Sequence, residues 1–150
     1  MTSPEKLREI EEFFHQQIPL TRAMALRVEA YDEQQLVLTA PLENNHNHLG
    51  TAFGGSLSAM AMVAGYGLVW LILGDHGREG HVVVRDVSIH FRRPVRGILR
   101  AICPRPDETA LVEFLKKFAS RHTAHLHLEV SIEQDDQVAV SFQGTFVAMR

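Results

Sequence analysis

Apolar and polar residues alternate with a period of two through much of the chain, which is the pattern of β-strands that bury one face. The alternation covers residues 24–31, 36–40, 83–92, 98–103, 125–133 and 138–148. In the stretch over 83–92, one predicted face holds Val83, Val87, Ile89 and Phe91, and the other holds Val84, Asp86, Ser88, His90 and Arg92. In the last stretch the predicted inner face holds Val138, Val140, Phe142, Phe146 and Ala148.

Two further stretches have the spacing of amphipathic helices. The first runs from Pro4 to Ile18, where Ser3 can cap the helix and Pro19 ends it. The second is a short helix late in the chain, with Asp107 as its expected cap. Both are predicted to lie outside the core, with one apolar side facing it.

One segment is apolar on all sides. No Asp, Glu, Lys or Arg occurs between Asn44 and Gly74, and residues 57–73 read LSAMAMVAGYGLVWLIL. This length approaches that of a membrane span. The flanking stretches alternate like half-buried strands, however, which favours a helix buried inside the fold. We therefore expect a buried helix from Gly54 or Gly55 to about Leu73 and no membrane span.

These elements predict one α+β domain over residues 1–150. Nearly every strand alternates, so the sheet should be antiparallel with one solvated face. Its apolar face needs a partner, and the helix over 55–73 is the one element apolar enough to supply it. The predicted architecture is a curved antiparallel sheet of about six strands wrapped around a long central helix, with an extra helix at the start and a short one late in the chain.

Composition and charge narrow the classes of partner. The chain has 150 residues, 15 Lys and Arg against 18 Asp and Glu, a net charge of −3 and a pI near 6.3. No basic excess points to nucleic acid or an anionic membrane surface. The single cysteine, Cys103, excludes an intrachain disulfide and cysteine-rich zinc sites. We expect a cytoplasmic protein without a metal.

The chain resembles the hotdog-fold thioesterases, and more narrowly the YiiD C-terminal type. The residues that carry the resemblance are Ile18-Pro19-Leu20-Thr21, Ala40-Pro41-Leu42, Asn45, Asn47, Gly50-Thr51-Ala52-Phe53-Gly54-Gly55-Ser56-Leu57 and Pro94-Val95-Arg96-Gly97. The resemblance implies a homodimer or a dimer of dimers, with active sites at the subunit interface. It implies acyl thioesters as substrates, with coenzyme A or phosphopantetheine present as part of the substrate and no separate cofactor.

Hydrolysis of a thioester requires donors that stabilise negative charge on the carbonyl oxygen. The amides of Gly55 and Ser56 are the expected donors, because N–H groups at a helix N-terminus are free and the dipole there is positive. Glycine also lets a ligand approach the backbone closely, although the glycines could serve packing alone. The side-chain amides of Asn45 and Asn47 are expected to position the carbonyl or a water molecule. The alternative for both is hydrogen bonding within their own loop.

The catalytic base is not identified by the sequence. Many related thioesterases carry a His before the glycines and an Asp or Glu further along the helix, but here Phe53 replaces that His. No carboxylate occurs between Gly55 and Gly74. Asp86 is the candidate base that we name, and a surface carboxylate is an equally good interpretation of it. His46, His48 and a water molecule held by amides and hydroxyls are the other candidates.

Phe53, Gly54 and Ser58 complete the expected surface for the acyl thioester. Arg92 and Arg93 could bind phosphates of coenzyme A, since a guanidinium matches phosphate geometry, or they could form a solvated basic edge. The hypothesis is therefore an acyl-CoA or acyl-carrier-protein thioesterase. The alternatives are a module that binds acyl thioesters without turnover and, less favoured, a hotdog hydratase or dehydratase.

Overall fold

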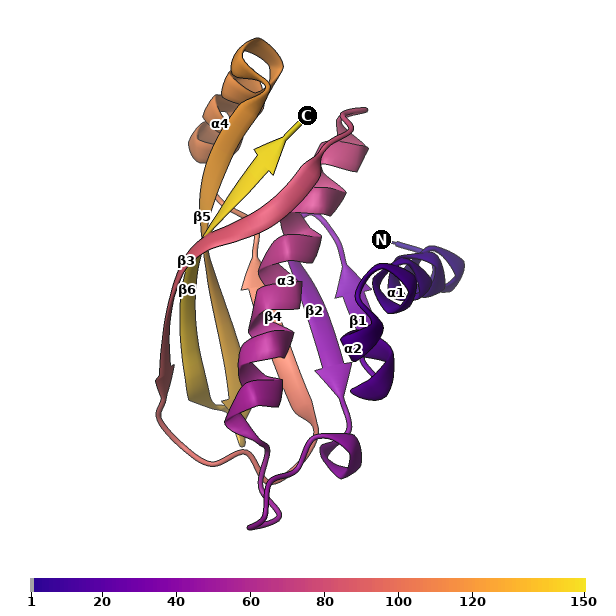
Figure 1. The fold of residues 1–150 in the computed structure, drawn as a ribbon, viewed down its shortest axis with the longest axis vertical. Helices are drawn as coiled ribbons and strands as arrows, with labels where there is room; N and C mark the ends of the chain where they lie inside the picture. The colour runs from indigo at the N-terminus through magenta and orange to yellow at the C-terminus, as the bar shows by residue number, and fades with distance from the viewer. Residues whose placement is uncertain (1) are drawn as a thin grey trace.

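The computed structural model of the protein describes residues 2–150, in which one long helix lies against a single curved antiparallel sheet (Figure 1). The sheet has six strands in the order β1-β2-β4-β5-β6-β3. The strands are β1 Arg27–Tyr31, β2 Gln35–Ala40, β3 His81–Phe91, β4 Leu99–Pro104, β5 Thr123–Gln134 and β6 Gln137–Met149. The helices are α1 Pro4–Gln17, α2 Pro19–Ala23, α3 Gly54–Asp75 and α4 Glu108–Arg121, with a 3₁₀ turn η1 at Leu42–Asn44. The predicted architecture is confirmed.

Helix α3 is the core of the molecule. It is long and apolar enough to cross a bilayer, but 67% of its apolar 18-residue stretch is buried inside the fold. Met60, Leu68 and Ile72 have no exposed surface. A Cβ at Gly65 would stand 2.3 Å from the ring of Phe146 on β6, so the missing side chain lets the helix approach the sheet closely. Core burial therefore explains the apolar composition of this segment.

The N-terminal helices close the side of α3 that the sheet leaves open. The Ser3 hydroxyl accepts a hydrogen bond from the amide of Lys6, as the predicted cap requires. The ring of Phe13 stacks on that of Trp70 in α3 at a centroid distance of 3.7 Å and an angle of 12°. Such a stacked pair adds about 0.5–1.5 kcal/mol to the burial of the two rings. Helix α1 is thus fixed to α3 as well as to β1.

The first strand begins later than the alternation predicts. Pro19 ends α1 as expected, but it also starts the short helix α2. The buried Thr21 hydroxyl donates to the carbonyl of Ile18 and satisfies the turn between the two helices. The backbone of Ala25 is left-handed, with φ of 56°. The predicted strand over 24–26 is therefore wrong: the chain turns there, and β1 starts at Arg27.

A β-bulge in β3 corrects the predicted faces of that strand. Val84 pairs with Phe146 and Asp86 pairs with Thr145, which leaves Arg85 as an additional residue between them. The extra residue reverses the alternation, so Val84 shares the inner face with Val87, and Val83 lies on the outer face. The predicted grouping of Val83 with Val87 is wrong because a period-two pattern contains no sign of an inserted residue.

A second bulge changes the start of β6. Val138 pairs with Glu133 and Val140 pairs with Ile132, so Ala139 is additional. Ala139 is fully buried, whereas Val138 is 40% exposed. The prediction that Val138 lines the inner face is therefore wrong, and Ala139 occupies that place.

Strand β3 forms an edge of the sheet and is unusually apolar for that position. It pairs with β6 alone in the described part of the chain. Three of its inner-face residues remain exposed: Val84, Val87 and Phe91. An unpaired edge with exposed apolar side chains is a surface that another chain can cover.

Candidate functional site

The start of α3 presents free backbone donors. Phe53 is the N-cap, and its side chain forms no capping hydrogen bond. The first hydrogen bond of the helix runs from the amide of Leu57 to the carbonyl of Phe53, at 3.0 Å. In residues 2–150, the amides of Gly54, Gly55 and Ser56 donate to no acceptor. Unpaired donors at a helix N-terminus attract negative charge, which is the property that the sequence predicts for this segment.

Asn45 fixes the loop that leads into this helix. Its Nδ2 donates to the carbonyls of Met24 and Pro41, at 2.9 and 2.8 Å. Its own carbonyl accepts from the amide of Phe53 at 2.7 Å. The side chain is buried, and its Oδ1 has no hydrogen-bond partner among the described residues. Asn45 therefore connects the N-cap of α3 to the chain at both ends of the first hairpin.

Asn47 closes the turn in the same loop. Its Oδ1 accepts from the amides of Leu49 and Thr51, at 2.8 and 3.2 Å, and its Nδ2 donates to the Thr51 hydroxyl at 2.9 Å. The Asn47 amide in turn donates to the Thr51 carbonyl at 2.7 Å. The side chain of Asn47 thus bonds only within its own loop, which is the second of the two interpretations that the sequence allows. That of Asn45 bonds to Pro41 in the loop and to Met24 before β1.

A cavity of about 310 Å³ lies beside the first turn of α3. It is lined by Ala52, Gly54, Leu57, Phe91, Arg92, Arg93, Pro94 and Val95. The Phe91 ring is 3.7 Å from the place of a Cβ on Gly54. The structure therefore brings Gly54 to the same cavity as Arg92 and Arg93, although the two arginines are far from Gly54 in the sequence.

The two arginines are held differently. Nε of Arg92 donates to the Ser141 hydroxyl at 2.8 Å. The backbone amides of Arg92 and Arg93 donate to the carbonyl of Ala139, the bulged residue of β6, at 2.7 and 3.2 Å. The bulge thus fixes the chain direction at the end of β3, where both side chains are exposed.

Phe53 and the two serines border the free amides. A Cβ on Gly55 would stand 2.3 Å from the Phe53 ring, so this ring lies over the α-carbon of Gly55 while 56% of Phe53 is exposed. The Ser58 hydroxyl donates to the carbonyl of Gly54 at 2.8 Å, within the helix. Ser56 is half-buried at the same turn.

The structure does not bring Asp86 to the start of α3. Asp86 lies on the outer face of the sheet, opposite the face that α3 covers, and it pairs with the side chain of Arg85 at 2.8 Å. It is also five residues from Phe91 along the strand, a distance of about 17 Å. His46 and His48 are exposed in the loop before the helix, where the His46 ring contacts the carbonyl of Asn47 at 2.9 Å.

Two residues of the site, Phe91 and Val95, are not among those that the sequence predicts. The alternation places Phe91 only on one face of a strand, and Val95 belongs to the Pro-Val turn. Val95 is fully buried, and its carbonyl accepts from the amide of Ala52 at 2.8 Å, which ties the turn to the residue before the N-cap. Ala52 and Val95 both lie in segments that carry the family resemblance, and this was the signal available in the sequence.

A separate polar cluster lies at the C-terminal end of α3. The Tyr31 hydroxyl donates to Asp75, and Arg105 donates to the Tyr31 hydroxyl at 3.1 Å. Burial, and then the neighbouring Asp75 carboxylate, hold the pKa of Tyr31 well above its usual range. This cluster joins β1, α3 and the end of β4, and it is distant from the free amides.

Known proteins resemble this chain over nearly all of its length. The family model described as "Putative thioesterase (yiiD_Cterm)" matches residues 7–150. A protein of unknown function from Chlorobaculum tepidum is 34% identical, with 95% of this chain and 93% of that chain covered and a TM-score of 0.90. A protein named as a putative thioesterase from Shewanella oneidensis is 26% identical, with 99% and 100% covered and a TM-score of 0.88.

A thioesterase from Haemophilus influenzae shares the fold at 17% identity, with 100% of this chain and 93% of that chain covered and a TM-score of 0.75. The family and the Shewanella oneidensis relative support thioester hydrolysis as the general activity. The curved sheet around α3 is the hotdog fold that the resemblance implies. On its match over residues 7–150, the chain belongs to the YiiD C-terminal family of thioesterases.

Proposed function

We propose that the protein hydrolyses acyl thioesters of coenzyme A or acyl carrier protein, with the thioester carbonyl bound at the start of α3. The observation that carries this proposal is the set of unpartnered amides at Gly54, Gly55 and Ser56. As water attacks, negative charge gathers on the carbonyl oxygen, and the amides of Gly55 and Ser56 stabilise it. Donors of this kind contribute on the order of 3 kcal/mol to the transition state.

Asn45 and Asn47 act as positioning residues in this proposal. Their hydrogen bonds hold the loop from which the N-cap of α3 begins, so they set the direction of the amides. The attacking water is oriented at the mouth of the site, and His46 or His48, exposed in the loop before α3, accepts its proton. Phe53, Ser58 and Gly54 border the acyl thioester, while Arg92 and Arg93 bind a phosphate of the carrier.

The protein acts as a homodimer joined through β3. Its unpaired edge and the exposed inner-face residues Val84, Val87 and Phe91 support this assembly. Pairing of two β3 strands across a two-fold axis would continue the sheet from one subunit into the other and cover the apolar surface. Because Phe91 also contacts the first turn of α3, the active site would border the interface.

The amide donors are tested by replacing residues within the first helical turn. The first turn of a helix tolerates proline, which has no backbone N–H. Ser56→Pro therefore deletes the amide donor of residue 56. We expect kcat to fall by about a hundredfold or more, with the thermal unfolding midpoint confirming that the variant is folded. Ser56→Ala, which keeps the amide and loses the hydroxyl, should stay within about tenfold of the wild type. Equal activity in Ser56→Pro and Ser56→Ala would overturn the assignment.

A binding module without turnover is the second candidate. Its specific support is that no carboxylate lies on α3 before Asp75 and that Asp86 lies on the outer face of the sheet. Thiol release from acyl-CoA esters of increasing chain length separates the two functions. Tight binding of these esters by the wild type without thiol release would favour the binding module.

A further inference from the structure

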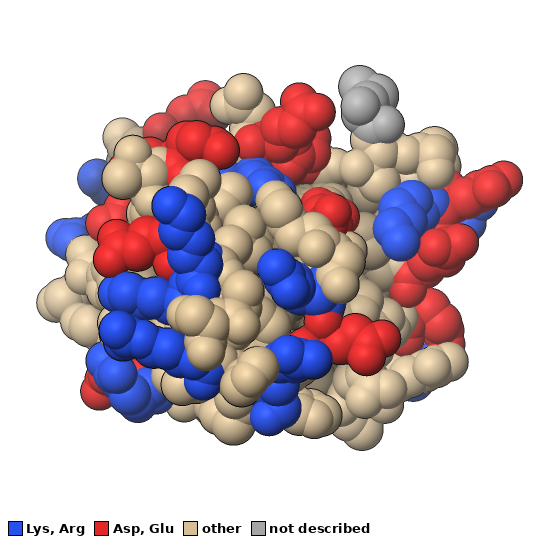
Figure 2. Space-filling view, turned by 90° about the horizontal axis from the view of Figure 1, so that it is seen from above, with Lys and Arg blue, Asp and Glu red and all other residues tan. Residues whose placement is uncertain are grey.

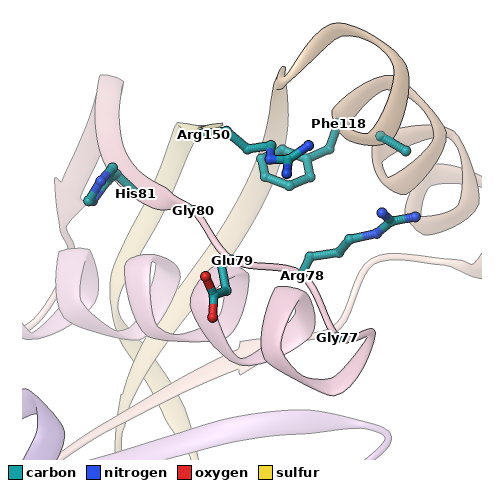
Figure 3. Close-up of a pocket in the computed structure, with 8 residues that line it drawn as sticks. Gly77, Arg78, Glu79, Gly80, His81, Phe118 and Arg150 are labelled. Atoms are coloured by element: carbon teal, nitrogen blue, oxygen red, sulfur yellow. The ribbon is translucent and has the colours of Figure 1, made fainter.

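A second, larger cleft lies at the opposite end of α3 from the free amides. Its volume is about 550 Å³, and it is formed where the loop after α3, helix α4 and the end of β6 meet (Figure 3). Its lining residues are Gly77, Arg78, Glu79, Gly80, His81, Phe118, Ala119 and Arg150. None of them belongs to the site described above.

The backbone that carries Arg78 is set by the end of α3. The amide of Arg78 donates to the carbonyl of Leu73 at 2.8 Å, and the amide of Gly77 donates to the carbonyl of Gly74 at 3.1 Å. This pair of bonds is a Schellman motif, which requires a left-handed residue after the helix. Gly77 meets the requirement with φ of 66°. Arg78 therefore leaves the helix in a fixed direction.

Gly80 brings the loop down onto the floor of the cleft. A Cβ at this position would stand 2.9 Å from the ring of Phe118 and 3.0 Å from the carbonyl oxygen of Met149. The glycine thus allows an approach that any side chain would prevent. The buried Phe118 ring forms the apolar floor; Arg150 extends across the ring, and Arg78 projects from the loop after α3 (Figure 3).

Arg150 is held at the other side of the cleft by His122. The backbone amide of Arg150 donates to the carbonyl of His122 at 3.0 Å, and its Nη1 donates to Nδ1 of the same histidine at 3.1 Å. A guanidinium carries only hydrogen-bond donors, so Nδ1 of His122 must be the acceptor of this bond. Two hydrogen bonds to one residue therefore orient the Arg150 side chain before any ligand arrives.

The charges at this cleft have one predominant sign. Arg78 and Arg150 form no ion pair with a carboxylate in residues 2–150, and His81 adds a third polar nitrogen-bearing group. Glu79 is the one acidic residue of the lining, and its side chain points to the other side of the loop from the two guanidinium groups (Figure 3). Figure 2, which looks down on this end of the molecule, shows more Lys and Arg side chains on one half of it than on the other, with Asp and Glu side chains among them.

We propose that the cleft between Arg78 and Arg150 binds phosphate of the carrier portion of the thioester. The inference rests on the proposed function and on the proposed dimer. Guanidinium groups form short charge-assisted hydrogen bonds with phosphate oxygens. Coenzyme A carries a pyrophosphate and a ribose phosphate, so it matches one cationic site at Arg92 and Arg93 and a second at this cleft.

The dimer brings the cleft of one subunit toward the site of the other. His81 begins β3 and Phe91 ends it, about 33 Å away. In an antiparallel pair of β3 strands centred on a two-fold axis, the first residue of one strand lies opposite the last residue of the other. The cleft of one subunit thus flanks the Gly54–Phe91 cavity of its partner, and each site is complete only in the dimer.

Binding affinity tests the cleft without depending on turnover. Calorimetry would measure the Kd of coenzyme A, 4′-phosphopantetheine and pantetheine for the wild type, Arg78→Gln and Arg150→Gln. Each substitution should raise the Kd of coenzyme A by about tenfold or more, and that of pantetheine by less than about twofold. Arg8→Gln, on the exposed surface of α1, is the matched control and should change neither value.

The ligand series identifies the phosphate that is bound. If the substitutions raise the Kd of coenzyme A but leave that of 4′-phosphopantetheine unchanged, the cleft binds the nucleotide end of coenzyme A. If they raise both Kd values, the cleft binds the pantetheine phosphate. An unchanged Kd for coenzyme A in both variants would overturn the proposal, as would an equal loss for pantetheine. A purely structural role of Arg78 at the negative end of the α3 dipole predicts a lower unfolding midpoint with unchanged Kd values.

Kinetics separate this inference from the proposed function. In an active enzyme, Arg78→Gln should raise KM for an acyl-CoA ester about tenfold while changing kcat little. A wild type that binds coenzyme A through Arg78 yet releases no thiol would contradict the proposed function and leave the cleft assignment standing. Thiol release with KM insensitive to both substitutions would contradict the cleft and leave the function standing.

Discussion

The tip of the Phe14 ring lies 2.5 Å from the place that a Cβ on Gly67 would occupy. Phe14 belongs to α1 and Gly67 to the middle of α3, so the missing side chain lets the two helices come together. Both residues are buried, and a second neighbour, Leu36 of β2, lies 3.3 Å from the same position. The close approach thus joins an N-terminal helix, the core helix and the sheet at one point.

Gly67→Ala should destabilise the protein by about 2 kcal/mol, because the added methyl group forces the buried Phe14 ring to move. Gly74→Ala is the matched control on the same helix, where nothing lies within 4 Å of the new Cβ. The free energy of unfolding of this control should rise by about 0.5 kcal/mol, because alanine has a higher helix propensity than glycine. Urea unfolding of both variants measures the difference, and equal free energies of unfolding would refute the close-packing explanation.

Asn45→Ala should cost about 2 kcal/mol of stability, since the buried carbonyl of Met24 and the half-buried carbonyl of Pro41 lose their donor. We expect kcat to fall together with stability, because the backbone carbonyl of residue 45, which accepts from the amide of the N-cap Phe53, is no longer held in place by its side chain. Asn44→Ala is the control: its Nδ2 makes one exposed bond, to the carbonyl of Ala23 at 3.3 Å. Chemical denaturation and thiol release measure both effects. Full stability in Asn45→Ala would show that the loop does not depend on this side chain.

Stability should decline at alkaline pH through Cys103. Burial raises the pKa of this thiol from 9.0 to about 12, so the folded protein keeps the proton that the unfolded chain releases. The stabilisation is fully present below the unfolded pKa and is lost as pH rises through the window from 9.0 to about 12. From about pH 8 to about pH 10 the loss is about 1.4 kcal/mol.

Urea unfolding at the two pH values checks this effect against Cys103→Ala, which lacks the titrating group. The variant will be less stable at each pH, but its decline between them should be smaller than that of the wild type by the stated amount. A parallel decline in both proteins would contradict the prediction. A slow reaction of the native protein with a thiol reagent would agree with it.

A charge at the exposed edge should dissociate the proposed dimer. Val87→Arg places a cation on the inner face of β3, where pairing of two copies would bring two like charges together. The mass measured by light scattering should fall from the dimer to the monomer. Val112→Arg, at an exposed position of α4, is the control and should leave the mass unchanged. A monomeric wild type, or a dimeric Val87→Arg, would exclude assembly through β3.

Part of the site could be predicted from residue chemistry alone. Free amides at Gly55 and Ser56 follow from glycines at the first turn of a helix whose N-cap, Phe53, has no side-chain acceptor. The roles of Asn45 and Asn47 could not be decided in this way. An amide can bind a ligand or its own loop, and the choice depends on carbonyls such as that of Met24, which is 21 residues away.

Local patterns determined the main elements of this protein. Burial requires an apolar residue at every position that faces the core, so the alternating strands, the uncharged helix α3 and the capping residues Ser3 and Asp107 were visible in the sequence. Tertiary structure decided where the alternation breaks, as at Arg85 and Ala139, because an inserted residue is recognised only from its partner strand. It also decided that Arg78 and Arg150 share one cleft, since the sequence does not encode distances between remote residues directly.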